Sequence, residues 1–334
     1  MRSFPFSNTT GSAAVRARVP AYAKLNLGLR VLYRRVDGYH EIRTVFQTIS
    51  LADRLDINFT PARTRRIEIK GTPEIPDNLV ERAAHLVMEA LSIQGHVFFD
   101  LKKNIPTGAG LGGGSSDAAA VLLALPAMAK KAVPAGRLHM LATQLGSDVP
   151  FFLHGGTALG LGRGEELYPL TDSPAARGLL VVPPVHSSTA EAYRDLSPGL
   201  TSIPLQNKLN SFQQEVWRGV AGGSVATSVT TDGNDFEDVV FARHPELRQI
   251  KKKLLRYGAK PAAMTGSGSA IFGIFTEAGR LERARKLFPK QIVCPISFLS
   301  RAQYRSAWRR ALKLHVEGTL WPPRSPSVRD QSAQ

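Results

Sequence analysis

Hydrophobic and polar residues alternate near the start of the chain. Between residues 23 and 31 most alternate positions are apolar, and Lys24 and Asn26 occupy polar positions between them. Because successive side chains of a strand point to opposite faces, this pattern predicts a β-strand. Lys24 and Asn26 are then expected on one face of it, about 7 Å apart along the strand.

Further along, the patterning switches between the periods of strands and helices. Strand-like segments are expected at 97–101, 155–160 and 179–182, and helical segments at 77–91, 134–145 and 235–257. The two kinds of element do not repeat as regular βαβ units, which favours an α+β fold. At 334 residues the chain is too long for one simple core and suits two domains that share a cleft.

Composition divides the chain into four parts. We expect a disordered tail over residues 1–18, a first domain over 19–172, a second domain over 173–304 and a basic, partly disordered extension over 305–334. Within the second domain, residues 221–233 are rich in Gly, Ser, Thr and Ala, which indicates a flexible insertion.

The segment most specific for chemistry is 108–117, which reads Gly-Ala-Gly-Leu-Gly-Gly-Gly-Ser-Ser-Asp and precedes an apolar, alanine-rich stretch. Backbone N–H groups of such a loop can point into one concavity, and the start of a helix adds partial positive charge. Ser115, Ser116 and Asp117 are all good N-cap residues, so we expect the helix to begin there. The segment therefore predicts a polyphosphate site.

Three common nucleotide-binding classes are excluded by what surrounds this loop. No Lys-Ser or Lys-Thr pair follows the glycines, as a Walker A motif requires. No acidic residue lies between Asp117 and Asp148, where a dinucleotide fold places one to hold a ribose. The chain also lacks the His-Arg-Asp and Asp-Phe-Gly motifs of protein kinases.

Three segments, in order along the chain, resemble the motifs of the GHMP small-molecule kinases. They are Ala-Lys-Leu-Asn-Leu at 23–27, Pro-Thr-Gly-Ala-Gly-Leu-Gly-Gly-Gly-Ser-Ser at 106–116 and Met-Thr-Gly-Ser-Gly-Ser-Ala-Ile-Phe at 264–272. One such segment would be suggestive, and three in order are specific.

Shorter segments narrow the resemblance to one family within that superfamily. Asp-Gly-Tyr-His-Glu at 37–41, Leu-Gly-Ser-Asp-Val-Pro at 145–150 and Asn-Asp-Phe-Glu at 234–237 are similar to the 4-diphosphocytidyl-2-C-methyl-D-erythritol kinases. The resemblance covers residues 19–299 and fails at both ends. It implies a two-domain α+β GHMP kinase fold, with an ATP-binding N-terminal domain and the active site in the cleft between the domains.

The same resemblance implies the reaction. Its members phosphorylate the 2-hydroxyl of a cytidine diphosphate-linked polyol with ATP, in the non-mevalonate (methylerythritol phosphate) route to isoprenoid precursors. Asp148 is the candidate base and Lys24 its partner. A lysine on the inner face of a strand is unfavourable unless it is paired, so an anionic neighbour is expected for Lys24.

The resemblance also carries over binding residues. For ATP these are Pro106, Thr107, Gly108, Ala109, Gly110, Leu111, Gly112, Gly113, Gly114, Ser115, Ser116, Asn78 and Lys103. For the second substrate they are Asn26, Tyr39, His40, Asp148, Thr189, Tyr193, Thr265 and Gly266.

Individual roles follow from the family. Tyr39 is expected to stack on the cytosine and His40 to hydrogen-bond it, while Tyr193 stands where the family usually has a phenylalanine. Mg²⁺ should accompany ATP, carried mainly by the phosphates. No protein ligand for it is clear, and Ser116 and Asp117 are the candidates.

Charge introduces a competing interpretation. The formal net charge is +16, which would suit a nucleic-acid-binding protein. However, aromatic residues are not interleaved with the basic ones as a single-strand-binding surface requires, so we favour a basic surface that attracts phosphorylated metabolites. The alternatives that stay open are a mevalonate or homoserine kinase, an RNA-binding protein, and a degenerate kinase retained as a binding protein.

Cellular context follows from what the chain lacks. Cys294 is its one cysteine, which excludes an intramolecular disulfide and fits a reducing cytoplasm. No apolar run approaches the roughly 18 residues that cross a membrane. We therefore expect a cytoplasmic protein without membrane partners, as a monomer or weak homodimer.

Overall fold

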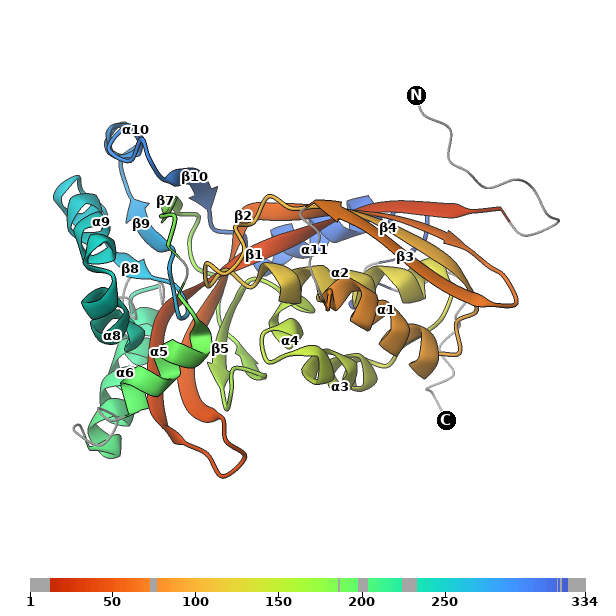
Figure 1. Ribbon diagram of the computed structural model, residues 1–334, viewed down its shortest axis with the longest axis horizontal. Coiled ribbons are helices and arrows are strands. Elements are labelled where there is room, and N and C mark those ends of the chain that lie inside the picture. The colour runs from red at the N-terminus through yellow and green to blue at the C-terminus, as the bar shows by residue number, and fades with distance from the viewer. Residues whose placement is uncertain are drawn as a thin grey trace.

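The computed structural model describes residues 13–72, 77–185, 187–197, 204–223, 233–316, 318 and 320–323. These residues form two sheets, each covered by helices, so the α+β expectation is confirmed (Figure 1). Along the chain, the last strand of the first sheet ends at Pro169 and the first strand of the second sheet begins at Arg177. We keep 172/173 as the proposed boundary between the domains.

The first sheet is built on one long antiparallel hairpin. Its strands are β1 (Val15–Arg34), β2 (His40–Thr60), β3 (Arg65–Thr72), β4 (Gly95–Lys102), β5 (Thr157–Leu161) and β6 (Glu166–Pro169). Their order is β3-β4-β2-β5-β6, and β1 pairs with β2. The β1–β2 register shifts on both sides of the segment that contains Lys24 and Asn26, so this short stretch is set off from the regular ladder.

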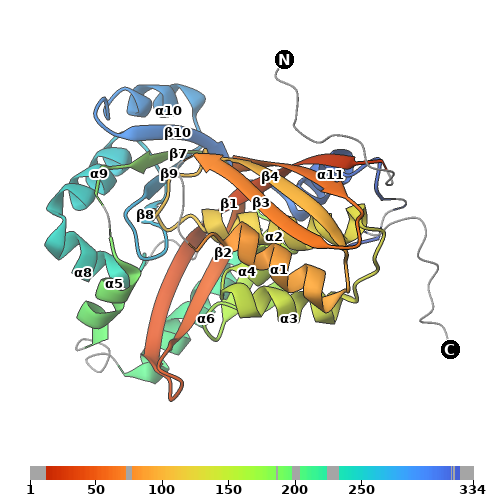
Figure 2. The same ribbon diagram turned by 45° about the vertical axis from the view of Figure 1, so that its right-hand side comes forward.

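Helices cover one face of this sheet. They are α1 (Leu79–Ala90), α2 (Gly113–Met128), α3 (Ala135–Leu145) and the short α4 (Val149–Phe152). Figure 2 shows α1, α2 and α3 together beneath the sheet. The helix that follows the glycine loop, α2, is buried along most of its length. Its alanines allow this central position, because small side chains let neighbouring elements approach closely.

The second sheet has the order β10-β7-β9-β8. Its strands are β7 (Arg177–Val182), β8 (Ala262–Met264), β9 (Ile271–Phe275) and β10 (Ile292–Ser297). The helices of this half are α5 (Thr189–Leu196), α6 (Leu205–Ala221), α8 (Phe236–Arg243), α9 (Pro245–Arg256) and α10 (Ala278–Arg285). The helical pattern expected over 235–257 is thus two helices. The break falls at His244-Pro245, because proline cannot donate the backbone hydrogen bond of a helix interior.

The β1–β2 hairpin belongs to both halves. Leu29 forms a parallel bridge with Asn234, and its backbone N–H and C=O bond to Gly233 and Asp235. Leu29, Val31 and Ile42 also lie in the hydrophobic core of the second half. The hairpin therefore fixes the second half against the first, and its far end runs beside α5 and α6 (Figure 1).

Both expected terminal segments need correction. β1 begins at Val15, so residues 15–18 are part of the sheet, while residues 1–12 lie outside the described part of the chain. At the other end α11 (Arg301–Ala311) crosses the expected 304/305 boundary. Its Tyr304 and Trp308 are buried in the core of the first half, so α11 belongs to that core and the expected extension cannot begin at residue 305; residues 324–334, at its end, lie outside the described part. The many basic residues of this segment suggested a solvated extension, but Tyr304 and Trp308 are four positions apart and share one face of the helix.

Of the insertion expected over 221–233, residues 224–232 lie outside the described part. In the described part of the chain, no helix has both the length and the apolar character to span a bilayer.

The C-terminal segment is anchored to α4, the helix that follows Asp148. The Tyr304 hydroxyl donates a hydrogen bond to the carbonyl oxygen of Phe152, and Trp321 Nε1 donates to the carbonyl oxygen of Leu153 at 2.7 Å. Gly155 lies against the Tyr304 ring, where an added Cβ would come within 2.4 Å of it. These contacts satisfy backbone carbonyls at the end of a very short helix.

We predict that Tyr304→Phe lowers the free energy of unfolding by about 1–2 kcal/mol, because it leaves a buried carbonyl without its donor. Urea denaturation checks this. Tyr257→Phe, at a partly exposed tyrosine, is the matched control and should shift stability by less than about 0.5 kcal/mol. Equal effects of the two variants would contradict the anchoring role of Tyr304.

Candidate functional site

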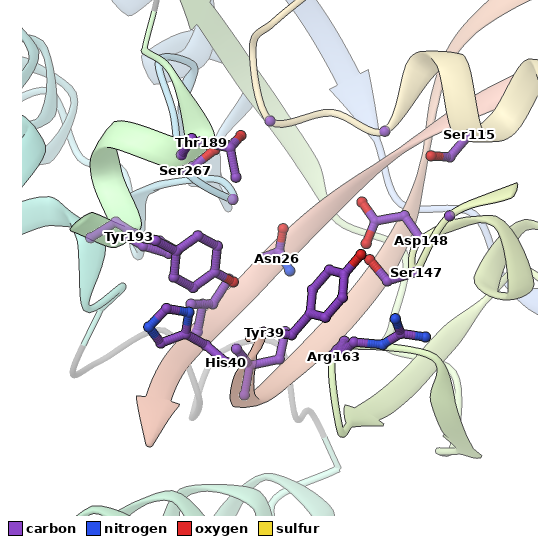
Figure 3. Close-up of a pocket in the computed structure, with 18 of the residues that line it drawn as sticks. Asn26, Tyr39, His40, Ser115, Ser147, Asp148, Arg163, Thr189, Tyr193 and Ser267 are labelled. Atoms are coloured by element: carbon purple, nitrogen blue, oxygen red, sulfur yellow. The ribbon is translucent and has the colours of Figure 1, made fainter. Parts of the chain in front are cut away.

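A cavity of about 990 Å³ lies between the two halves of the molecule. Residues from β1, β2, the glycine loop, the 146–148 turn, α5 and the 266–267 loop line it, and Figure 3 shows their side chains. The predicted residues that line it are Lys24, Asn26, Tyr39, His40, Gly110, Gly112, Ser115, Asp148, Thr189, Tyr193 and Gly266. The structure therefore gathers segments that are far apart in the sequence.

Lys24 and Asn26 lie on the same face of β1. Lys24 Nζ donates a hydrogen bond to Asn26 Oδ1 at 2.5 Å. Asn26 Nδ2 in turn donates to Thr44 Oγ1 at 2.8 Å, and the Thr44 hydroxyl donates to the Gly28 carbonyl. Both side chains are almost fully buried, so this chain of bonds fixes their positions.

The anionic neighbour of Lys24 is Asp148. Lys24 Nζ lies 3.4 Å from Asp148 Oδ2; the lysine side chain is 4% exposed and that of the aspartate 31%. Asp148 immediately precedes α4, and Pro150 in the first turn of α4 restricts the backbone there. A nearly buried ammonium thus holds a carboxylate that faces the cavity.

The glycine loop is locked between β1 and the 265–270 loop. Gly110 has φ +77°, and a Cβ at this position would lie 2.2 Å from the Thr265 carbonyl oxygen. Lys24 N–H donates to the Leu111 carbonyl at 3.0 Å, and the Thr265 hydroxyl donates to the Gly110 carbonyl at 3.3 Å. The three segments that resemble GHMP motifs are therefore in direct contact through their backbones.

The helix after this loop begins earlier than the sequence predicted. α2 starts at Gly113, with Gly112 in the left-handed conformation as its N-cap, and no side chain caps it. The expected cap at Ser115, Ser116 or Asp117 is wrong, because Gly112 turns the chain first and all three residues lie inside the helix, with Ser116 and Asp117 buried. Without a side-chain cap, the first N–H groups of α2 stay available to an anion.

The 265–270 loop is held by Asn26 and by two residues, Asn234 and Glu237, for which the sequence predicted no role. Asn234 Nδ2 donates to the Met264 carbonyl at 3.0 Å and to the Gly266 carbonyl at 2.6 Å. Glu237 Oε1 accepts a bond from Met264 N–H at 2.8 Å, and Thr265 Oγ1 accepts one from Asn26 N–H at 2.9 Å. The Asn-Asp-Phe-Glu segment at 234–237 contributed to the family resemblance and contains Asn234 and Glu237, but the sequence did not indicate what these two side chains do.

Aromatic side chains form the end of the cavity that is remote from α2. Figure 3 shows Tyr39 and Tyr193 across an open space from each other. The His40 ring stacks on Tyr193, with centroids 4.5 Å apart, and Phe236 meets Tyr193 edge-on at 4.8 Å. His40, expected to bond a base, thus contacts the second aromatic residue here.

Protonation states at this end follow from burial. Desolvation, aided by the positive charge of Arg34, lowers the pKa of His40, so its imidazole is neutral at pH 7 and can both donate and accept a hydrogen bond. Desolvation, with a smaller contribution from the charge of Asp148, raises the pKa of Tyr193 to about 12. Tyr193 therefore presents a phenol to the cavity.

Thr189 and Ser267 join the two loops at the rim of the cavity. Thr189 Oγ1 lies 2.8 Å from Ser267 Oγ, and the Ser187 hydroxyl donates to the Ser267 carbonyl at 2.8 Å. Thr189 is the first residue of α5, so its position follows the start of that helix.

Of the predicted ATP-binding residues, only Gly110, Gly112 and Ser115 line this cavity; Asn78, Lys103, Pro106, Thr107, Gly108, Ala109, Leu111, Gly113, Gly114 and Ser116 do not. The Asn78 side chain accepts a hydrogen bond from Val80 N–H and caps α1. Lys103 is buried behind the glycine loop, where its ammonium pairs with Asp53 and with Asp117, the latter at 2.7 Å. Sequence reasoning missed Asp53, which lies in a strand without any motif around it.

The candidate metal ligands Ser116 and Asp117 are both nearly buried near the start of α2. Asp117 is engaged by Lys103. Among the residues that the structure describes, no three His, Cys, Asp or Glu side chains group in a way that could hold a metal ion.

Comparisons with known proteins agree with this geometry. Residues 78–156 match the GHMP kinases N terminal domain, and residues 225–291 match the GHMP kinases C terminal family. A 4-diphosphocytidyl-2-C-methyl-D-erythritol kinase from Solibacter usitatus is 51% identical over 318 residues, which cover 94% of this chain and 98% of that protein.

Solved structures give the same result. A crystal structure of 4-(cytidine 5'-diphospho)-2C-methyl-D-erythritol kinase aligns with a TM-score of 0.71 and 37% identity, covering 84% of this chain and 98% of that one. A homoserine kinase from Cytophaga hutchinsonii aligns with a TM-score of 0.64 over 89% of this chain and 98% of that one, but at 18% identity it shows the fold alone. The resemblance found in the sequence is confirmed, and the chain belongs to the 4-diphosphocytidyl-2-C-methyl-D-erythritol kinase family of ATP-dependent GHMP kinases.

Proposed function

We propose that this protein transfers the γ-phosphoryl group of ATP to the 2-hydroxyl of 4-diphosphocytidyl-2-C-methyl-D-erythritol, giving the 2-phosphate and ADP. The observation that carries the proposal is the position of the Lys24–Asp148 pair, 3.4 Å apart in one cavity with the start of α2 and the aromatic residues. A polyol joined to cytidine would place its hydroxyl beside the pair and its base between the aromatic rings.

Asp148 is the group that receives the acceptor hydroxyl. Its carboxylate faces the cavity, accepts the hydroxyl proton and directs an oxygen lone pair toward the γ-phosphorus of ATP. The new bond joins that oxygen to phosphorus while the bond from phosphorus to the β–γ bridging oxygen breaks, and ADP leaves. Lys24 orients Asp148 and adds positive charge where the transferring phosphoryl group passes.

The triphosphate is proposed to lie against the glycine loop. The left-handed glycines turn backbone N–H groups toward a ligand, and the uncapped N-terminus of the 16-residue α2 adds its partial positive charge. Ser115 lines the cavity at the first turn of α2, so it is placed to bind the triphosphate.

Mg²⁺ is proposed to enter with ATP, held mainly by the phosphates. Ser115 supplies a hydroxyl oxygen of the kind that this ion prefers, which fits a site with few protein ligands. When bound, the ion offsets negative charge on the phosphates.

The base-binding end distinguishes this reaction from that of related kinases. Tyr39 and Tyr193 offer flat faces, and stacking contributes about 1–3 kcal/mol per base. A mevalonate or homoserine kinase has no need of such a groove, since its acceptor carries no ring. We also propose a cytoplasmic location and a monomer or weak homodimer, as the sequence predicts.

The reaction is tested by measuring ATP consumption with the cytidyl substrate, mevalonate and homoserine in parallel, with phosphorus NMR of the product. A new phosphomonoester on the cytidyl substrate alone supports the proposal. Folded protein that binds ATP but transfers nothing to that substrate would overturn the assignment. An RNA-binding role predicts instead tight, salt-sensitive RNA binding that survives loss of Asp148.

We predict that Asp148→Asn and Lys24→Ala each lower kcat by at least about 100-fold. Asp148→Asn removes the proton acceptor, and Lys24→Ala removes the ammonium that holds the Asp148 carboxylate in position. Steady-state kinetics check this, with circular dichroism to establish folding. Asp238→Asn and Lys252→Ala, at exposed positions, are the matched controls. Near-normal turnover by either folded active-site variant would refute its role.

The cluster behind the glycine loop yields a pH prediction. Burial raises the pKa of Asp117 to about 7, with the Lys103 charge opposing this shift and the Asp53 charge adding to it. The folded protein therefore retains a proton that the unfolded chain releases above about pH 4, so the free energy of unfolding falls as the pH rises toward 7.

Asp117→Asn removes this dependence. We predict that the unfolding free energy of the wild type, relative to the variant, falls by at least about 1 kcal/mol between about pH 5 and about pH 8. Urea denaturation at the two pH values measures it, and Asp238→Asn is the control. A difference that does not change with pH would contradict a protonated Asp117 in the folded state.

A further inference from the structure

Arg163 packs on the Tyr39 ring, although 124 positions separate the two residues in the chain. Its guanidinium carbon lies 4.7 Å from the ring centroid, and both residues line the cavity. In Figure 3, Arg163 lies on the side of Tyr39 that faces away from Tyr193. One face of the tyrosine is therefore covered by a cation, and the other is directed toward the open space.

Glu165 fixes the arginine in this position. Arg163 Nε donates to Glu165 Oε1 at 3.0 Å, and the backbone N–H of Arg163 donates to Glu165 Oε2 at 2.7 Å. Both carboxylate oxygens of Glu165 thus accept hydrogen bonds from Arg163. This leaves the flat face of the guanidinium, which is the part that stacks on aromatic rings, directed at Tyr39.

The turn that carries Arg163 is itself anchored to β2. Ile42 N–H donates to the Gly162 carbonyl at 2.7 Å, only three residues after Tyr39. Gly164 lies against the Phe46 ring, where an added Cβ would come within 3.4 Å of it. The turn that carries Arg163 and the residue Tyr39 are therefore both attached to β2, and this strand sets the geometry between them.

Tyr39 needs such a support. It follows the Asp37-Gly38 turn at the end of the β1–β2 hairpin, and it is 57% exposed. An exposed side chain that must hold one orientation to stack on a ligand loses conformational freedom on binding, and this loss weakens affinity. A contact that orders the ring beforehand removes part of that loss.

We propose that Arg163 is a positioning residue that determines affinity for the base: its guanidinium, held by Glu165, keeps the Tyr39 ring ready to stack on the cytidine base. The inference rests on the proposed function, because it assigns Tyr39 to the base of that substrate. It predicts an effect on binding of the cytidyl group and none on the ATP end of the cavity or on phosphoryl transfer.

The test compares Arg163→Met, Arg163→Lys, Tyr39→Leu and the double variant Arg163→Met/Tyr39→Leu. Binding of cytidine 5'-diphosphate is measured by calorimetry in the absence of ATP, and KM and kcat are measured with the full cytidyl substrate. Arg248→Met is the matched control, since Arg248 lies 5.9 Å from the Phe241 ring and does not line the cavity.

We expect Arg163→Met to weaken cytidine diphosphate binding and raise KM for the cytidyl substrate about 3- to 30-fold, with kcat and the KM for ATP unchanged within about twofold. Arg163→Lys keeps a cation and should recover part of the affinity. In the Tyr39→Leu background, Arg163→Met should have no further effect, because the ring through which it acts is gone.

The outcomes separate the inference from the function on which it rests. If the wild type phosphorylates the cytidyl substrate and Arg163→Met binds cytidine diphosphate as tightly as Arg248→Met does, the inference is wrong and the function stands. An equal loss in the presence and absence of Tyr39 would also overturn it, since the arginine would then act by another route. If the wild type fails to phosphorylate the cytidyl substrate, the proposed function itself is wrong.

Discussion

The nearly buried ammonium of Lys24 is the constraint around which the site is arranged. A charge held away from water must be paired, and Lys24 Nζ meets Asn26 Oδ1 at 2.5 Å and Asp148 Oδ2 at 3.4 Å. The partners come from β1 and from the turn before α4, so the ion pair ties the sheet to the helical layer. The backbone N–H of the same lysine bonds to the Leu111 carbonyl, so one strand position places both the carboxylate of Asp148 and the glycine loop.

Contact between backbones joins this arrangement to the second half of the molecule. Gly110 approaches Thr265 so closely that no side chain fits between them, and Asn234 holds the Thr265 loop from its other side. A site shared by two halves requires that they keep a constant relative position. The β1–β2 hairpin keeps this relative position constant. Leu29 belongs to β1 of the first sheet, and its backbone also bonds to Gly233 and Asp235, the neighbours of Asn234 in the second half.

The two ends of the cavity differ in how they are built. The end at the start of α2, where we propose that the triphosphate binds, consists of glycine backbone locked by hydrogen bonds, which suits a ligand group common to many kinases. The other end, where we propose that the base binds, consists of the side chains Tyr39, His40 and Tyr193, supported from outside by Arg163 and Phe236. Under the proposed function, recognition of one particular acceptor therefore depends on a small number of side-chain contacts, and we expect changes there to leave the other end of the cavity intact.

The sequence by itself determined the elements and residues that depend on local order. Alternation around Lys24 and Asn26 predicts the strand and its polar face, and the glycine loop predicts an anion site, because these features arise between near neighbours in the chain. Pairings between distant segments were decided only by the tertiary structure. Lys103 lies between Asp53 and Asp117, α11 packs its aromatic residues in the first half, and Gly112 starts α2 before the serines. Arg163 meets Tyr39 for the same reason: burial and packing bring together residues whose separation along the chain carries no periodic signal.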